Sequence, residues 1–218
     1  MKIILIRHGA SAGDSFACPK PPVKNFLTAT GVQQAERLRE VLNKIEIGAA
    51  FSSPYGRALQ TAEIVLAGKN IEIATFDFLK EWDVNPAFKE FPSAEFDAIM
   101  NSYQTSDIEE TWKTDLGEGT FELYARICPP FLAELKKLGI HAGGGGFHIE
   151  ERAEDLNLAV FAHGGSLAIL LSFILETRPF PLSRFAFQLT GPAIIDFIKH
   201  KETYYPQLLI NNVNFFRS

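Results

Sequence analysis

Two histidines in this chain directly follow short apolar runs, where a buried strand is expected to end. His8 comes after Arg7 and the run Lys2 to Ile6, and His163 comes after the run Leu156 to Ala162. Imidazole can act as a nucleophile or as a general acid or base near neutral pH. The guanidinium of arginine is a planar fork of donors that fits phosphate oxygens. Such a pair can also simply cap carbonyl groups or reach solvent, so it does not establish a site alone.

Glycines and another arginine add to the case for a phosphate site. Gly9 follows the first histidine, and two glycines beginning with Gly164 follow the second. Glycine lets the main chain approach a ligand without a side-chain clash. Arg57 lies near the start of a helix that Ser53-Pro54 is expected to open, where the helix dipole also favours an anion. These features favour anion chemistry at the ends of two strands.

The elements that must carry these residues alternate between strands and helices from the first residue. The expected strands are Lys2 to Ile6, Ala49 to Ser52, Ile71 to Phe76, Leu156 to Ala162, Ala193 to Ile198 and a short one at Leu208 to Ile210. The expected helices are Thr30 to about Lys44, Ser53-Pro54 to about Leu66, Ser93 to Gln104, one from near Thr120 with a kink or break at Pro129-Pro130, and Ser166 to Leu175. The alternation predicts an α/β fold, a three-layer α/β/α sandwich with a largely parallel central sheet. Ligands of such sheets bind beyond the carboxyl ends of the strands, where both histidines are expected.

The chain is expected to fold as a single domain over residues 1–218, with two additions to the α/β core. The aromatic-rich segment 82–117 predicts a lid-like insertion, and the Gly-rich segment of about 141–155 predicts a flexible loop. His141 and His148 flank these glycines without metal-ligand companions, so we expect no metal site there.

Composition narrows the class of protein. The chain has 218 residues, 46% of them hydrophobic, and a formal net charge of −5. That charge disfavours nucleic acid and anionic membranes as partners. The cysteines, Cys18 and Cys128, do not make the disulfide framework of a small secreted domain. No apolar run has the length of a signal peptide core or a membrane span, so a cytoplasmic protein is expected.

Four blocks of the sequence resemble, in order, the histidine phosphatase superfamily, also called phosphoglycerate mutase-like. ILIRHGAS at Ile4 to Ser11 is similar to the family's strand that ends in Arg-His-Gly. The other blocks are LTATGVQQAERL at Leu27 to Leu38, SSPYGRALQTA at Ser52 to Ala62, and VFAHGGSLAIL at Val160 to Leu170. Together the blocks span most of the chain.

The resemblance implies a two-step phosphoryl transfer in which His8 attacks phosphorus and carries a phosphohistidine. It implies that Arg7, Arg57 and His163 hold the phosphoryl oxygens, with Gly164 beside them. Two guanidinium groups and an imidazole can neutralise the transferred phosphoryl group without a metal ion, so we expect no metal and no cofactor. His8 must be neutral on its attacking nitrogen, and the partner of the other ring nitrogen sets that tautomer.

The family draws the proton for the leaving alcohol from a carboxyl group after the third strand. Glu81, in LKEWD, fits that position best, and Asp83 is its competitor. Glu118, in Gly117-Glu118-Gly119, resembles the family's Gly-Glu-Ser block, but it could equally be a helix N-terminal carboxylate favoured by the dipole.

Ser11 and Asp14 are candidate substrate contacts on the loop after the first strand. Many family members have Asn where this chain has Asp14, and the family commonly has Glu or Gln where this chain has Ala10. An acid at position 14 would repel phosphate unless a nearby lysine pairs with it. These departures bear on the substrate contacts more than on the chemistry.

The segment from Trp82 to Gly117 favours a phosphatase over a mutase. It holds two Lys, no Arg and eight acids, a net charge of −6. A mutase must bind a substrate with a carboxylate besides its phosphate, and this segment disfavours a multiply anionic molecule. We therefore expect hydrolysis of a small-molecule phosphomonoester. A phosphoglycerate mutase and a noncatalytic phosphate-binding module remain the alternatives, and the sequence leaves a homodimer open.

Overall fold

The computed structural model describes residues 1–12, 24–82, 117–179 and 184–209. Its strands form one sheet of eight in the order β3-β2-β6-β1-β7-β8-β5-β4. The strands are β1 (Lys2–Arg7), β2 (Ala49–Ser52), β3 (Ile73–Thr75), β4 (Ile140–Gly143), β5 (Gly146–Ile149), β6 (Asn157–Ala162), β7 (Pro192–His200) and β8 (Thr203–Leu209). The helices are α1 (Ala29–Leu42), α2 (Gly56–Val65), α4 (Thr120–Lys137) and α5 (Gly164–Ile174), with short 3-10 helices η2 (Asp77–Leu79) and η5 (Glu151–Ala153).

The sheet is mixed, which corrects the prediction of a largely parallel one. β3, β2, β6 and β1 run parallel to their neighbours, whereas β1 pairs antiparallel with β7. β7, β8, β5 and β4 continue the antiparallel pairing. Two of these antiparallel pairs, β7–β8 and β4–β5, are hairpins, and strands joined by a tight turn must run antiparallel. The α/β fold itself is confirmed.

The segment 141–155, predicted to be a flexible loop, instead forms most of the β4–β5 hairpin and then η5. Its turn is Gly144-Gly145, with φ of 64° and 78°. Two consecutive residues at positive φ make the tight turn that matches strand twist, and glycine adopts this conformation without strain. The glycines therefore mark a turn between paired strands.

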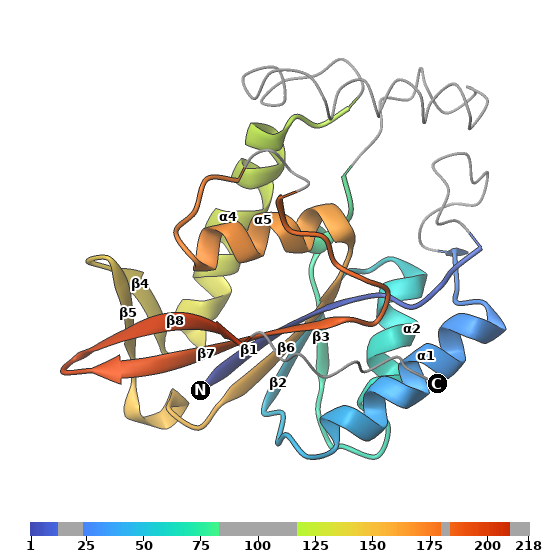
Figure 1. Ribbon diagram of the computed structural model, residues 1–218, viewed down its shortest axis with the longest axis horizontal. Helices are drawn as coiled ribbons and strands as arrows, with labels where there is room; N and C mark the ends of the chain where they lie inside the picture. Colours follow the sequence, from blue (N-terminus) through green and yellow to red (C-terminus); the bar gives the residue numbers. More distant parts are fainter. Residues whose placement is uncertain (13–23, 83–116, 180–183, 210–218) are drawn as a thin grey trace.

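Helices cover both faces of the parallel half of the sheet. Figure 1 shows α1 and α2 on one side and α4 and α5 on the other. Alternate residues of a strand point to opposite faces, so Ile3 and Leu5 of β1 join the core beneath α4 and α5. Ile4 and Ile6 join the core beneath α1 and α2. β1 is therefore buried from both sides, and its carboxyl end is held rigidly.

The other predicted helices and strands that fall on described residues lie close to their predicted positions and differ mainly at their ends. α4 continues through Pro129-Pro130, where a kink or break was expected, as one helix. The short strand at Leu208 to Ile210 is the end of the longer β8. The predicted lid-like insertion and the helix Ser93 to Gln104 lie outside the described residues. In the part of the chain that is described, no helix has the length and hydropathy needed to cross a membrane.

Candidate active site

His8 lies one residue beyond β1 and is only 3% exposed. Its Nδ1 is 2.8 Å from the carbonyl oxygen of Gly9, and Nε of Arg57 donates to its Nε2 over 3.1 Å. A carbonyl oxygen can only accept, so Nδ1 carries the proton and Nε2 carries the lone pair. His8 thus has the tautomer that a nucleophile needs, with the lone pair directed toward a guanidinium.

The loop that carries His8 is packed tightly against α1 and α2. A Cβ on Gly9 would lie 2.7 Å from the carbonyl oxygen of Gly31, which no real side chain tolerates. The N–H of Gly9 donates to Oγ1 of Thr61 over 3.1 Å, and the N–H of Ala10 donates to Oε1 of Gln34 over 2.8 Å. The Arg-His-Gly loop therefore needs glycine for close approach, and two helices fix its position.

Arg57 lies on the first turn of α2, where its side chain reaches His8. Its side chain is 8% exposed, and its guanidinium lies 5.3 Å from the ring centroid of Tyr55. An arginine over an aromatic face is held in one orientation by a cation–π contact. The structure therefore brings Arg57 beside His8.

His163, at the N-terminus of α5, is fully buried beside His8. The two ring centroids are 5.0 Å apart, and Nε2 of His163 lies 2.9 Å from Oγ of Ser53. Burial, followed by electrostatic interactions with Arg57, His8 and Arg7, holds the pKa of His163 well below 6.5. His163 is therefore neutral in the folded chain.

The neutral state of His163 makes stability depend on pH in a defined direction. Between the lowered folded-state pKa and the unfolded value near 6.5, the unfolded chain binds more protons. The free energy of unfolding should therefore fall as pH drops below about 6.5, by at most about 1.4 kcal/mol per pH unit from this residue. Urea unfolding from pH 7 to pH 5 checks this, and His163→Gln should lack that contribution. Parallel profiles for the variant and the wild type would assign the pH dependence to other groups.

Arg7 adds a second guanidinium group beside the two histidines. Its Nη1 donates to the carbonyl oxygen of Phe187 over 2.8 Å, and a Cβ on Gly164 would lie 3.8 Å from its guanidinium carbon. Among the described residues, Arg7 Nε and His163 Nδ1 are buried polar atoms without a hydrogen-bond partner. Buried polar groups are nearly always paired, so two neighbouring exceptions indicate a ligand site.

The carboxylate of Glu81 sits on the N-terminus of α5, next to His163. Its Oε1 accepts hydrogen bonds from the main-chain N–H groups of Gly165 over 3.1 Å and Ser166 over 3.2 Å. The N–H of Trp82 donates to the same oxygen over 3.0 Å. A helix N-terminus favours a negative charge, so this position is physically consistent. Glu81 therefore joins the cluster that the other predicted residues form.

Four further predicted residues either make their hydrogen bonds outside the cluster or lie outside the described residues. Oγ of Ser11 accepts a hydrogen bond from Nδ2 of Asn25 over 3.4 Å. Asp14 and Asp83 lie outside the described residues. Glu118 forms a two-point ion pair with Arg126, with N–O distances of 2.5 and 2.7 Å. The carboxylate at the N-terminus of α4 is instead Glu122, which accepts from the N–H of Gly119.

Sequence reasoning passed over several residues that support the cluster. Ser53 contacts His163, and the ring of Tyr55 lies against the guanidinium of Arg57. The hydroxyl of Thr61 accepts from the N–H of Gly9 and donates to the carbonyl oxygen of Arg57. All three belong to the SSPYGRALQTA block, so the signal was present in the motif. Arg126 had no such signal.

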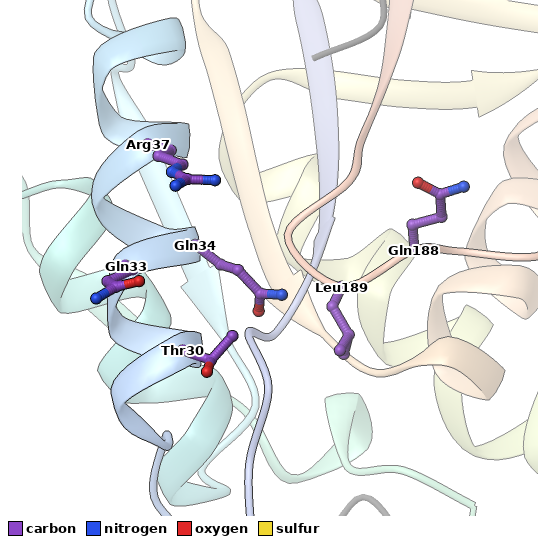
Figure 2. Close-up of a pocket in the computed structure, with 6 residues that line it drawn as sticks. All are labelled: Thr30, Gln33, Gln34, Arg37, Gln188 and Leu189. Carbon is purple, nitrogen blue, oxygen red and sulfur yellow. The ribbon is translucent and has the colours of Figure 1, made fainter. Parts of the chain in front are cut away.

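A pocket of about 440 Å³ lies near this cluster, between α1 and the segment before β7 (Figure 2). It is lined by Thr30, Gln33, Gln34, Arg37, Gln188 and Leu189. None of these is a predicted catalytic residue. Gln34 nonetheless binds the N–H of Ala10, so the pocket borders the loop that carries His8.

Comparison with known proteins agrees with the geometry. The family model of the histidine phosphatase superfamily (branch 1) matches residues 3–205. The chain is 24% identical to the adenosylcobalamin/alpha-ribazole phosphatase of Escherichia coli over 177 residues, 79% of this chain and 78% of that protein. It is 29% identical to a probable phosphoglycerate mutase of Proteus mirabilis over 120 residues, 55% of this chain. The match spans about half of that mutase, 51% of its length.

A solved structure shows the same fold over nearly the whole chain. The mycobacterial glucosyl-3-phosphoglycerate phosphatase aligns with a TM-score of 0.74 at 20% identity. The alignment covers 98% of this chain and 99% of that one.

Proposed function

This chain belongs to the histidine phosphatase superfamily, and on that premise we propose that it hydrolyses a small phosphomonoester through a phosphohistidine on His8. The observation that carries the proposal is the pair of buried, unpartnered nitrogens, Arg7 Nε and His163 Nδ1, beside the ring of His8. If the hydroxyl of Ser53 donates to Nε2 of His163, then Nδ1 carries a proton to donate. Phosphoryl oxygens are the acceptors that suit both nitrogens.

In the first proposed step, Nε2 of His8 attacks phosphorus while the bond from phosphorus to the leaving oxygen breaks. The guanidinium groups of Arg7 and Arg57 offset the charge on the equatorial oxygens, and the neutral imidazole of His163 donates a hydrogen bond to one of them. The leaving oxygen takes a proton from the carboxyl group of Glu81 and departs as an alcohol. No metal ion or cofactor is needed in this step.

In the second proposed step, water attacks phosphorus opposite the bond to Nε2 of His8, from the side that the alcohol has left. The Glu81 carboxylate accepts a proton from the water as the new bond to phosphorus forms. The bond between phosphorus and Nε2 breaks, and its electron pair returns to His8. Inorganic phosphate is released, and His8 and Glu81 are restored to their starting states.

Mutase activity is the second candidate, because the curated relatives include mutases as well as phosphatases. The segment from Trp82 to Gly117, with its net charge of −6, favours a leaving group that is neutral or apolar over a phosphoglycerate. We therefore place hydrolysis first and treat the cytoplasmic location, the single domain and the small-molecule partner as part of the same proposal.

The test compares hydrolysis with transfer in one preparation. We expect turnover of 4-nitrophenyl phosphate that persists in a chelator and is inhibited by vanadate, which mimics the transferred phosphoryl group. Conversion of 3-phosphoglycerate to 2-phosphoglycerate should be at least about 100-fold slower in kcat/KM than hydrolysis. Faster mutase turnover would reverse the order of the candidates. No turnover on any phosphomonoester would instead support a noncatalytic binding module.

A further inference from the structure

We infer that Arg126 is a positioning residue for the general acid, because its guanidinium binds the main chain that carries Glu81. The inference rests on the proposed role of Glu81 and extends it to a residue of α4. Glu118 supports this role, because its carboxylate pairs with Arg126. Neither residue is expected to touch the substrate.

Both Nη atoms of Arg126 donate hydrogen bonds to main-chain carbonyl groups of the segment that ends at Glu81. Nη1 donates to the carbonyl oxygen of Phe78 over 3.0 Å and to that of Lys80 over 3.3 Å. Nη2 donates to the carbonyl oxygens of Lys80 and Glu81, each over 3.3 Å. One side chain thus holds three carbonyl groups within four consecutive residues.

Glu118 fixes the guanidinium in this orientation. Its two carboxylate oxygens accept hydrogen bonds from Nε and Nη2 of Arg126 over 2.5 and 2.7 Å. This two-point pairing sets the plane of the guanidinium. The side chains are 27% and 19% exposed, so the pair is largely shielded from water. The indole N–H of Trp82 also donates to the carbonyl oxygen of Glu118. Trp82, the residue after Glu81, is therefore bound to Glu118 as well.

Glu81 is consequently held at both ends by different helices. Its carbonyl oxygen is bound by Arg126 of α4, and its carboxylate is bound by the N–H groups of Gly165 and Ser166 of α5. A general acid must lie within hydrogen-bond distance of the leaving oxygen, and a displacement of about 1 Å can cost about 100-fold in rate. Loss of Arg126 would leave three carbonyl groups without this donor and free the main chain of Glu81 to move.

The effect should depend on the leaving group, which separates positioning from general loss of structure. Arg126→Gln should lower kcat/KM on glycerol 2-phosphate, an alkyl ester, by about 10- to 100-fold. It should change kcat/KM on 4-nitrophenyl phosphate by less than about threefold, because kcat/KM reports the steps up to departure of the leaving group and nitrophenolate leaves without a proton. Arg126→Lys should show a similar loss, since an ammonium cannot bind three carbonyl groups and a carboxylate in one plane.

A double-variant comparison tests whether Arg126 acts through Glu81. The double variant Glu81→Gln/Arg126→Gln should hydrolyse glycerol 2-phosphate at the same rate as Glu81→Gln alone, within about threefold. Once the acid is removed, a residue that only positions the acid can have no further effect on the rate. Arg152→Gln is the matched control. Arg152 also pairs with a glutamate, Glu150, at 2.7 Å, but on the hairpin side of the sheet, and its loss should leave both rates unchanged.

The outcomes separate this inference from the proposed function. If Glu81→Gln lowers kcat/KM equally on both esters, the role of Glu81 as the acid is wrong. If Glu81→Gln is selective for the alkyl ester but the Arg126 variants are not, the positioning role is overturned. Should Arg126→Gln fail to fold, Glu118→Gln takes its place, because the amide keeps one acceptor for Arg126. It should lose about 3- to 10-fold, on the alkyl ester only, and an equal loss on both esters would overturn the inference.

Discussion

A chain carrying His8→Asn should retain less than about a thousandth of the wild-type kcat/KM on 4-nitrophenyl phosphate. The substitution removes the only atom proposed to form a bond with phosphorus, His8 Nε2, whose lone pair faces Arg57 at 3.1 Å. His8 is 3% exposed, so alanine would leave a cavity, whereas asparagine fills part of the space and offers polar atoms to its neighbours. Steady-state kinetics and a thermal unfolding curve are measured on the same sample.

His148→Asn is the matched control for this prediction. It makes the same change at an exposed histidine on β5 and should keep wild-type rates. A His8→Asn chain that is folded and retains more than about a thousandth of the activity would rule out covalent catalysis by His8.

Glu81→Gln should lower hydrolysis of glycerol 2-phosphate by about two to four orders of magnitude, the usual range for general acid catalysis. The alkoxide is a poor leaving group and needs a proton, whereas nitrophenolate does not. Gln keeps an oxygen that can accept from Gly165 and Ser166, so the N-terminus of α5 should stay paired. With 4-nitrophenyl phosphate, the loss in the first step should therefore be much smaller.

Asp83→Asn gives a second check on Glu81, because Asp83, two residues further on, carries the competing carboxyl group. Equal losses of kcat/KM on both esters in Glu81→Gln would assign Glu81 to positioning. A selective loss in Asp83→Asn would then transfer the role of acid to Asp83.

The parts of this site that could be predicted are those whose signals are local. β1 and β6 are short apolar runs because they are buried on both faces, and each ends directly before a histidine. The pairing of β1 with β6 in parallel then places His8 and His163 at one edge. The residue types and strand ends therefore indicate Arg7 and the two histidines, whereas Arg57 is indicated by the expected start of a helix and by the family resemblance.

The parts that could not be predicted depend on contacts between distant segments. Glu81 meets α5 across 84 positions of sequence, and Arg126 meets the carbonyl oxygen of Glu81 across 45. A main-chain carbonyl leaves no trace in residue type, so nothing in the sequence marks Arg126 as its donor. The mixed sheet was missed for a related reason, since the Gly144-Gly145 turn was interpreted as a loop although it joins two paired strands.

The most direct measurement is to trap the phosphorylated chain. Wild-type protein mixed with a phosphomonoester and quenched within milliseconds in alkali should carry up to about one phosphoryl group per chain, stable in base and labile in acid, as expected for a phosphohistidine. Peptide mapping should place it on His8, and the His8→Asn chain should carry none. Steady turnover with no phosphorylated chain at any time, or a phosphoryl group on another residue, would contradict a mechanism through His8.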